Sequence, residues 1–295
     1  MKIHGGTTEG HGSMIPNRLR SLLPFFLLVV CSFLLASKVM VAQAAISAGL
    51  MPFQLAIFGN AGAAGVLLAF AHATGQAISW ERSHLALYIV LGTISFAVPT
   101  VVAYMIVDPV GPAYVSSLYA LSPVLTMTLA AIVGLEGMTP RRTLGILIGF
   151  AGIMALVQQR IAGIDFSETG WVLLGLTVPL AAASGNIIRT AFWPGGASPL
   201  SFATATLLVS SILLATVGPF LESTAAWSII GDGRLFWLMV LIGVSALSYV
   251  LNYTFQKVAG PVVFSQIGYW GTGFGVVLAA ILFGDVLQIT SLMGG

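Results

Sequence analysis

Polar side chains with the spacing of a binding face are few in this chain, and they lie inside long apolar segments. Asn252 and Gln256 are four residues apart, as are Gln266 and Trp270, so each pair shares one face of a helix. Tyr269 follows Gln266 by three residues and can join that face. An amide donor beside an aromatic ring suits an amphipathic ligand. The alternatives are hydrogen bonds between helices for the amides and contact with lipid for the rings.

Lys38 lies late in the first apolar segment, where a charged side chain is costly. It could face a central cavity, where it would pair with the carboxylate of a solute or titrate, or its long side chain could extend to the membrane surface. The sequence leaves both interpretations open. Arg189 lies 151 positions later, as a rough counterpart, and its place at the end of the sixth apolar segment predicts an anchor at the membrane surface.

Further polar candidates lie on other segments. Asn186 joins Asn252 and Gln256 as a polar set, for which contact between helices is the alternative role. Tyr119 and Asn60 are weaker candidates on the fourth and second segments. The predicted substrate-binding residues are therefore Lys38, Asn60, Tyr119, Asn186, Asn252, Gln256, Gln266, Tyr269 and Trp270.

No pattern in the chain indicates catalysis. DxD, HExxH, Walker and GxSxG motifs are absent, and the four histidines do not cluster: they are His4, His11, His72 and His84. The single cysteine, Cys31, excludes an intrachain disulfide and a CxxC metal site. We predict no catalytic residue, no metal site and no cofactor, and a protein that is not an enzyme.

The composition identifies the solvent of the chain. Of 295 residues, 58% are hydrophobic and 7% are charged, with a mean hydropathy of +1.01, whereas a soluble domain carries about 25% charged residues. This charge is too sparse to cover a water-exposed surface, so we expect a lipid bilayer around the protein. No basic patch is present, so we expect no nucleic-acid partner.

Nine apolar segments have about the length that crosses a bilayer as a helix. They cover 21–43, 52–73, 84–105, 112–135, 143–158, 170–190, 198–218, 235–256 and 261–283. Residues 1–17 are polar and predict a disordered tail. A cleaved signal peptide over the first segment is the alternative, but that segment is long and carries Lys38 before the Ala42-Gln43-Ala44 site.

An internal repeat divides the chain. Gly111-Pro112 and the following serine at 116 recur 149 positions later as Gly260-Pro261 and Ser265, and a Leu-Ala-Ala-Ile block recurs in the same register. Repeats set the architecture, so we predict two related halves, 18–160 and 161–295. The first half has five segments, so a tenth helix is expected beyond residue 285. The predicted fold is all-α, with ten transmembrane helices.

Lysine and arginine in the loops predict the orientation. They concentrate on the side of the N-terminus, which is therefore placed in the cytoplasm: Lys2, Arg18, Arg20, Arg82, Arg141, Arg142, Arg189 and Lys257. The opposite side carries Arg160 and Arg234. An odd number of helices per half gives the halves opposite orientations, which is an architecture common in secondary transporters that work by alternating access.

The repeat also carries a family resemblance. The Gly-Pro helix start, Ser122-Pro123-Val124 in mid-helix, Glu136 at the helix end and the run from Arg142 to Ile153 resemble an EamA-type member of the drug/metabolite transporter superfamily. The second half resembles the same module through Gly260-Pro261 and the Leu-Phe-Gly-Asp that ends at Asp285. The resemblance implies a ten-helix bacterial inner-membrane protein, and many members export amino acids and related metabolites.

Two departures from the family pattern concern helix shape and helix ends. Pro123 has Thr272 as its counterpart, flanked by Gly271 and Gly273, so we expect helix four to bend through a lost backbone bond and helix nine through glycine flexibility. Asp285 stands where the family usually has Glu. Its counterpart Glu136 precedes a helix-start signal, which predicts that it caps the following helix.

The repeat architecture predicts a secondary transporter, and the family resemblance implies that it exports small organic metabolites such as amino acids. No carboxylate lies mid-membrane to relay protons, which favours facilitated diffusion or exchange. A membrane-embedded enzyme or a non-transporting structural membrane protein is the alternative, and a channel would need a continuous polar stripe. A monomer is favoured.

Overall fold

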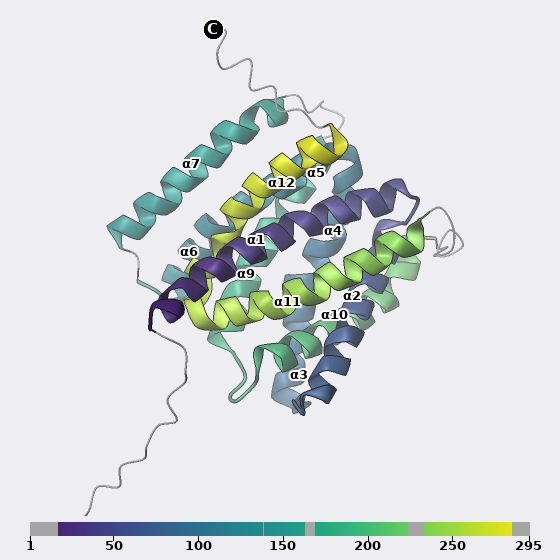
Figure 1. The fold of residues 1–295 in the computed structure, drawn as a ribbon, viewed down its shortest axis with the longest axis vertical. Coiled ribbons are helices and arrows are strands. Elements are labelled where there is room, and N and C mark those ends of the chain that lie inside the picture. Colours follow the sequence, from purple (N-terminus) through teal and green to yellow (C-terminus); the bar gives the residue numbers. More distant parts are fainter. Residues whose placement is uncertain (1–16, 138, 163–168, 224–232, 285–295) are drawn as a thin grey trace, which may run out of the picture.

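The computed structural model describes residues 17–137, 139–162, 169–223 and 233–284, which form a bundle of helices with no strand among them. The prediction of an all-helical protein is confirmed for this part of the chain (Figure 1). Its first half contains α1 (Asn17–Ser47), α2 (Pro52–Ala73), α3 (Arg82–Leu91), η1 (Gly92–Ala97), α4 (Val98–Val110), α5 (Pro112–Leu118), η2 (Tyr119–Leu121), α6 (Ser122–Val133) and α7 (Pro140–Ala162). Its second half contains α8 (Thr169–Gly175), α9 (Thr177–Ala191), α10 (Pro199–Leu221), α11 (Arg234–Ser265) and α12 (Ile267–Phe283).

Several of these helices join end to end into longer spans. Within the described residues, seven spans are long and apolar enough to cross a membrane: Leu22–Ser47, Pro52–Ala73, Arg82–Val110, Pro112–Val133, Gly170–Ala191, Pro199–Leu221 and Arg234–Ser265. The shorter apolar helix Ile267–Phe283 follows. The fifth segment forms α7 and extends beyond its predicted limits at both ends. The expected tenth helix and the predicted tail, except Asn17 at the start of α1, lie outside the described residues.

Proline and glycine set the ends of the helices. Pro52, Pro112, Pro140 and Pro199 each begin a helix, where the missing N–H costs no hydrogen bond. Gly111 and Gly260 precede the repeated proline with nearly the same extended, positive-φ backbone (φ 84°, ψ 153° and φ 79°, ψ 171°). Only glycine adopts such angles at little cost. The repeated sequence thus has the same local backbone at both positions.

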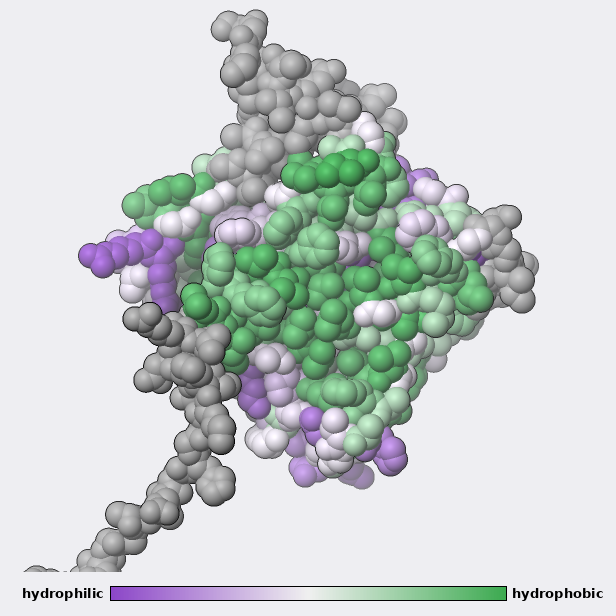
Figure 2. Space-filling model, viewed as in Figure 1, coloured by the Kyte–Doolittle hydropathy of each residue, from purple (hydrophilic) through white to green (hydrophobic). Residues whose placement is uncertain are grey.

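The outer surface of the bundle is apolar. Figure 2 shows hydrophobic side chains covering much of the visible face. Phe220, Ile132 and Ile281 are 88%, 74% and 72% exposed. Exposing such large apolar side chains is unfavourable in water but not in lipid. The interior instead contains polar side chains, among them buried Asn60, Asn186, Gln256 and Arg189. An apolar exterior around polar interior side chains is the pattern of a membrane protein with an internal polar site.

Three helix irregularities lie next to the centre of the bundle. The π-helical turn η1 interrupts the third span, and π-turns of this kind often occur at functional sites. The 3₁₀ turn η2 interrupts the fourth span directly before Pro123, which sits in the first turn of α6. In the second half the interruption lies at Gln266, between α11 and α12. Of the predicted flexible glycines, Gly271 packs against Leu35 of α1, and Gly273 has open space beside it.

The sequence predicted that Glu136 caps the following helix, α7, but Thr139 takes that place, because its hydroxyl accepts the Arg142 N–H (3.4 Å). The glutamate carboxylate instead accepts the backbone N–H of Val262 (3.3 Å), near the start of the helix that follows Gly260, and accepts a hydrogen bond from Arg142 of α7 (2.8 Å). Free N–H groups at a helix start attract a carboxylate whether it comes from near or far in sequence. Glu136 therefore connects the two halves at one end of the bundle. Asp285 lies outside the described residues.

Candidate functional site

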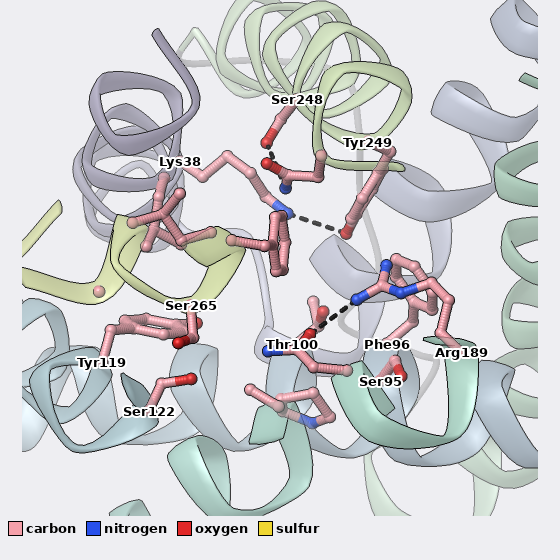
Figure 3. Close-up of a pocket in the computed structure, with 18 residues that line it drawn as sticks. Lys38, Ser95, Phe96, Thr100, Tyr119, Ser122, Arg189, Ser248, Tyr249 and Ser265 are labelled. Atoms are coloured by element: carbon pink, nitrogen blue, oxygen red, sulfur yellow. Dashed lines mark hydrogen bonds between the residues drawn. The ribbon is translucent and has the colours of Figure 1, made fainter. Parts of the chain in front are cut away.

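A cavity of about 110 Å³ lies in the centre of the bundle and is reached by helices from both halves (Figure 3). Its size accommodates several waters or a small solute, whereas pockets for drug-sized ligands are about 300–1,000 Å³. The lining residues are Leu35, Lys38, Ser95, Phe96, Pro99, Thr100, Tyr119, Ser122, Ala182, Asn186, Arg189, Ser248, Tyr249, Asn252, Phe264, Ser265, Ile267 and Gly268. They come from α1, η1, α4, η2, α6, α9, α11 and α12.

Lys38 of α1 is held at the cavity by α11. Its ammonium donates a hydrogen bond to the Tyr249 hydroxyl (2.8 Å) and lies 4.1 Å from the centre of the Tyr249 ring. Tyr249 donates in turn to Asn60 Oδ1 (3.2 Å), and Asn60 Nδ2 donates to Ser210 Oγ (3.4 Å). This chain links α1, α11, α2 and α10. The side chain thus points inward, and the alternative in which Lys38 extends to the membrane surface does not hold.

Arg189 of α9 supplies a second cation to the cavity wall. Its side chain is only 5% exposed, and Nη2 donates to Asn186 Oδ1 (2.8 Å). The guanidinium carbon lies 4.4 Å from the ring centre of Tyr253 and 5.4 Å from that of Phe264. Buried Nε has no hydrogen-bond partner among the described residues. The prediction that Arg189 anchors at the membrane surface is wrong: aromatic rings and Asn186 hold it inside the bundle.

The cavity carries two cationic groups and no acidic one among its described lining residues. In the described part of the chain, the salt bridge is that between Arg142 and Glu136, at the end of the bundle. Removing a cation from water costs several kcal/mol, and a desolvated cation–π contact returns about 2 kcal/mol, which is less than that penalty. The positive charge of Lys38 and Arg189 is therefore only partly compensated by the side chains around it.

Amides and hydroxyls complete the polar wall. Asn252 donates to Ser248 (3.4 Å), and its Oδ1 is buried without a partner in the described chain. Asn186 Nδ2 donates to Thr126 (3.5 Å). Behind it, Gln256 donates to the Asn186 carbonyl and to Thr190, both at 2.7 Å. The bond to Thr126 orients the Asn186 side chain that contacts Arg189, and Gln256 holds the backbone of α9 at this position.

Four predicted site residues line the cavity: Lys38, Tyr119, Asn186 and Asn252. Two lie directly behind it, Asn60 and Gln256, each 2% exposed and bonded to a lining residue. The other three lie elsewhere: Gln266 donates to the Val262 carbonyl, Tyr269 donates to Ile146 of α7, and Trp270 packs on Phe25 with 44% of its surface exposed.

Sequence reasoning missed Arg189 as a lining residue, and it missed η1, which contributes Ser95 and Phe96. Arg189 had a usable signal, because it is the rough repeat counterpart of Lys38. Six lining positions form three repeat pairs in exact register, 149 apart: Pro99 with Ser248, Thr100 with Tyr249, and Tyr119 with Gly268. The π-helical turn has no sequence signal of comparable strength.

A second, smaller cavity of about 30 Å³ adjoins the first. It shares four lining residues with the central cavity, namely Leu35, Lys38, Thr100 and Tyr119. The rest of its wall is apolar apart from Tyr104 and includes Val107 and Val115, next to the α4–α5 junction. Lys38 thus lies where the polar centre meets a narrow apolar extension toward one end of the bundle. Glu136 and Val262 lie at the junction of α6 and α11, away from this extension.

Three comparisons relate this architecture to known proteins. Residues 22–158 match the EamA-like transporter family. A WAT1-related protein from Arabidopsis thaliana is 26% identical to this chain over an alignment of 301 positions, gaps included. The alignment covers 90% of this chain and 80% of the plant protein. A solved crystal structure superposes with a TM-score of 0.69 at 16% identity over 90% of both chains, which shows the fold alone.

The family match covers the first half, which supplies Lys38 and Tyr119, and the plant relative extends the similarity over both halves. The apolar exterior and the long helices agree with a membrane protein. Residues 22–158 thus form an EamA-like transporter domain, and the similarity to the plant protein over both halves supports the drug/metabolite transporter superfamily for this membrane protein.

Proposed function

We propose that this chain is a secondary transporter that exports small organic metabolites, amino acids among them, across the bacterial inner membrane by alternating access. The observation that carries the proposal is the polar cavity walled by both halves of an otherwise apolar bundle. A structural membrane protein has no use for a costly internal hollow of this kind. An embedded enzyme would need reactive groups that converge on it, and the described lining offers amides, hydroxyls and cations instead.

The proposed mechanism treats 18–160 and 161–295 as inverted repeats that rock about the central cavity. Contacts that cross between the halves at one end then close that end. Glu136 is such a contact, because it bonds both Arg142 of its own half and Val262 of the other. The lysines and arginines of the loops support a cytoplasmic position for this end, together with the N-terminus. Opening toward the cytoplasm would require the Glu136–Val262 bond to break.

Counterflow in proteoliposomes tests the proposal, with monomeric purified protein as the starting point. Vesicles preloaded with an unlabelled solute exchange it for the labelled form outside only if a carrier is present. The panel contains glutamate, alanine, leucine and lysine, with and without a pH gradient. Uptake above protein-free vesicles supports the proposal, and indifference to the gradient supports uncoupled movement. Leakage of every solute without exchange would contradict it.

A further inference from the structure

The charge of the cavity wall bears on which solutes the proposed transporter accepts. Lys38 and Arg189 enter the cavity from different helices, and in Figure 3 they extend from opposite sides of the view. Their described hydrogen-bond partners are neutral: Tyr249 for Lys38 and Asn186 for Arg189. An ammonium group has three donors, and this bond uses one of them. The wall therefore presents positive charge that no neighbouring carboxylate in the described chain neutralises.

We propose that the cavity binds a small organic anion through a carboxylate that Lys38 and Arg189 neutralise. The inference rests on the proposed transport function and narrows its substrate class. Charge-assisted hydrogen bonds from ammonium and guanidinium groups to a carboxylate are the strong ones in a site of this kind. The Asn252 side chain and the aromatic rings of Phe96 and Tyr119, which line the same cavity, remain for the rest of the solute.

The same wall disfavours other charge types. A cationic solute would add a third positive charge beside Lys38 and Arg189, with no described acidic residue to offset it. A neutral zwitterion could place its carboxylate on the cations, but its ammonium would find only amide and hydroxyl oxygens. An acidic amino acid or a dicarboxylate has a net negative charge and fits better. The volume of about 110 Å³ limits the solute to a small one.

Net negative charge would also supply the direction of transport. No carboxylate among the described lining residues is available to carry a coupled proton. A carrier returns to its starting state after each cycle, so the charge moved per cycle is that of the solute. Since the cytoplasm is electrically negative, an anion that moves alone is driven outward. Each ~59 mV shifts the equilibrium ratio of a monovalent anion about tenfold.

Two readouts test the solute class. In detergent, the thermal midpoint of the purified protein is measured with succinate, glutamate, inorganic phosphate, leucine or putrescine at equal ionic strength. In vesicles, counterflow is measured for the same compounds. We expect succinate or glutamate to raise the midpoint and to exchange at least about tenfold faster than leucine or putrescine, a preference of about 1.4 kcal/mol. Phosphate as the strongest binder would replace the carboxylate with an inorganic anion and overturn the organic part of the proposal.

Variants assign the effect to the two cations. Lys38→Met and Arg189→Met should each abolish the preference for anions, and Lys38→Arg and Arg189→Lys, which retain the charge, should keep part of it. The matched control is Lys257→Met, because Lys257 is exposed and donates to the Ala197 carbonyl away from the cavity. Should a Met variant fold poorly, the charge-retaining variants and the ligand series on the parent protein still decide the question.

A membrane potential tests the direction. With valinomycin and a potassium gradient that makes the vesicle interior positive by ~59 mV, net uptake of glutamate should rise about tenfold at equilibrium. Accumulation that ignores the potential would overturn this part of the proposal. If leucine or putrescine exchanges and the anions do not, the solute class is wrong and the transport function stands. If an anion stabilises the protein but nothing exchanges, the solute class stands and the transport function is wrong.

Discussion

The two halves of the molecule contribute one cation each to the same cavity, in different settings. Lys38 lies at the junction of the polar cavity and its apolar extension and is held by one hydroxyl. Arg189 is almost fully buried between two aromatic rings and an amide. A compact ammonium on a flexible stem can follow a moving ligand, whereas a planar guanidinium in a packed slot stays in place. The comparison suggests a fixed cation in one half and an adjustable one in the other.

Removal of the fixed cation should have the largest effect. Truncating one partner of a buried charge pair costs about 2–5 kcal/mol of binding, so Arg189→Met should lower exchange by at least about 30-fold. The thermal midpoint of the empty protein should stay the same or rise, because an incompletely neutralised buried charge is removed. Counterflow measures the exchange rate, and a thermal unfolding curve measures the midpoint. A lower midpoint together with normal exchange would assign Arg189 to structure alone.

A substitution at the repeat partners Tyr119 and Gly268 tests how closely the halves must pack. A Cβ on Gly268 would collide with the Tyr119 carbonyl and lie 3.3 Å from Pro123 Cδ. Overpacking costs about 1–3 kcal/mol, so Gly268→Ala should lower the unfolding midpoint.

The matched control for this prediction is Gly273→Ala on the same helix, which meets open space and should be neutral or slightly stabilising. Equal midpoints for the two alanine variants would show that the contact is not tight. Slow exchange in Gly273→Ala with an unchanged midpoint would support the predicted role of Gly273 in helix bending.

Loss of the adjustable cation should have a smaller effect than loss of the fixed one. Lys38→Met should weaken anion exchange about tenfold, near 1.4 kcal/mol. Tyr249→Phe keeps the ring beside the ammonium and removes the hydroxyl that Lys38 bonds. The loss of this hydrogen bond should lower the free energy of unfolding by about 0.5–1.5 kcal/mol. Concentration dependence of counterflow separates weaker binding from slower cycling. If Lys38→Met exceeds Arg189→Met in effect, the assignment of fixed and adjustable cations is reversed.

The smallest expected effect concerns the contact between halves at Glu136. The ion pair with Arg142 is partly exposed, so its loss costs about 0.2–1 kcal/mol. In a Cys31→Ser background, Glu136→Gln should raise the rate at which a Ser265→Cys thiol is modified from the cytoplasmic side, by up to about fivefold. Arg141→Gln, at the exposed neighbouring position, is the control. An unchanged rate would remove Glu136 from the closing of this end.

The sequence predicts the helices well, because length and apolarity are local properties. It also places polar residues on segments, and Lys38, Tyr119, Asn186 and Asn252 do line the cavity. It does not predict which way a helix face points. On α12, Gly268, Gly271 and Gly275 approach α1, η2 and α5 closely, which turns Trp270 away from the cavity. Small residues mark the packed face of a membrane helix more reliably than polar ones mark the binding face.

Arg189 illustrates a second limit of prediction from the sequence. A helix-end arginine is usually an anchor, and only the rings of Tyr253 and Phe264, 64 and 75 positions later in the chain, give it an interior place. Contacts over such separations depend on the whole bundle. The internal repeat is the usable signal, because Arg189 lies 151 positions after Lys38, within two residues of the 149-residue repeat spacing.

The hydrogen bond from Asn60 to Ser210 has a consequence for the history of the chain. Ser210 lies 150 positions after Asn60, so two nearly equivalent positions of the repeat touch each other, on α2 and α10, which pack together. In an isologous dimer, a residue meets its own copy only on the two-fold axis. This contact is the one expected if a gene for a single half, whose product paired with itself, duplicated and fused. Asn60 and Ser210 would then descend from adjacent positions of one ancestral helix, since the exact repeat partner of Asn60, 149 positions later, is Val209.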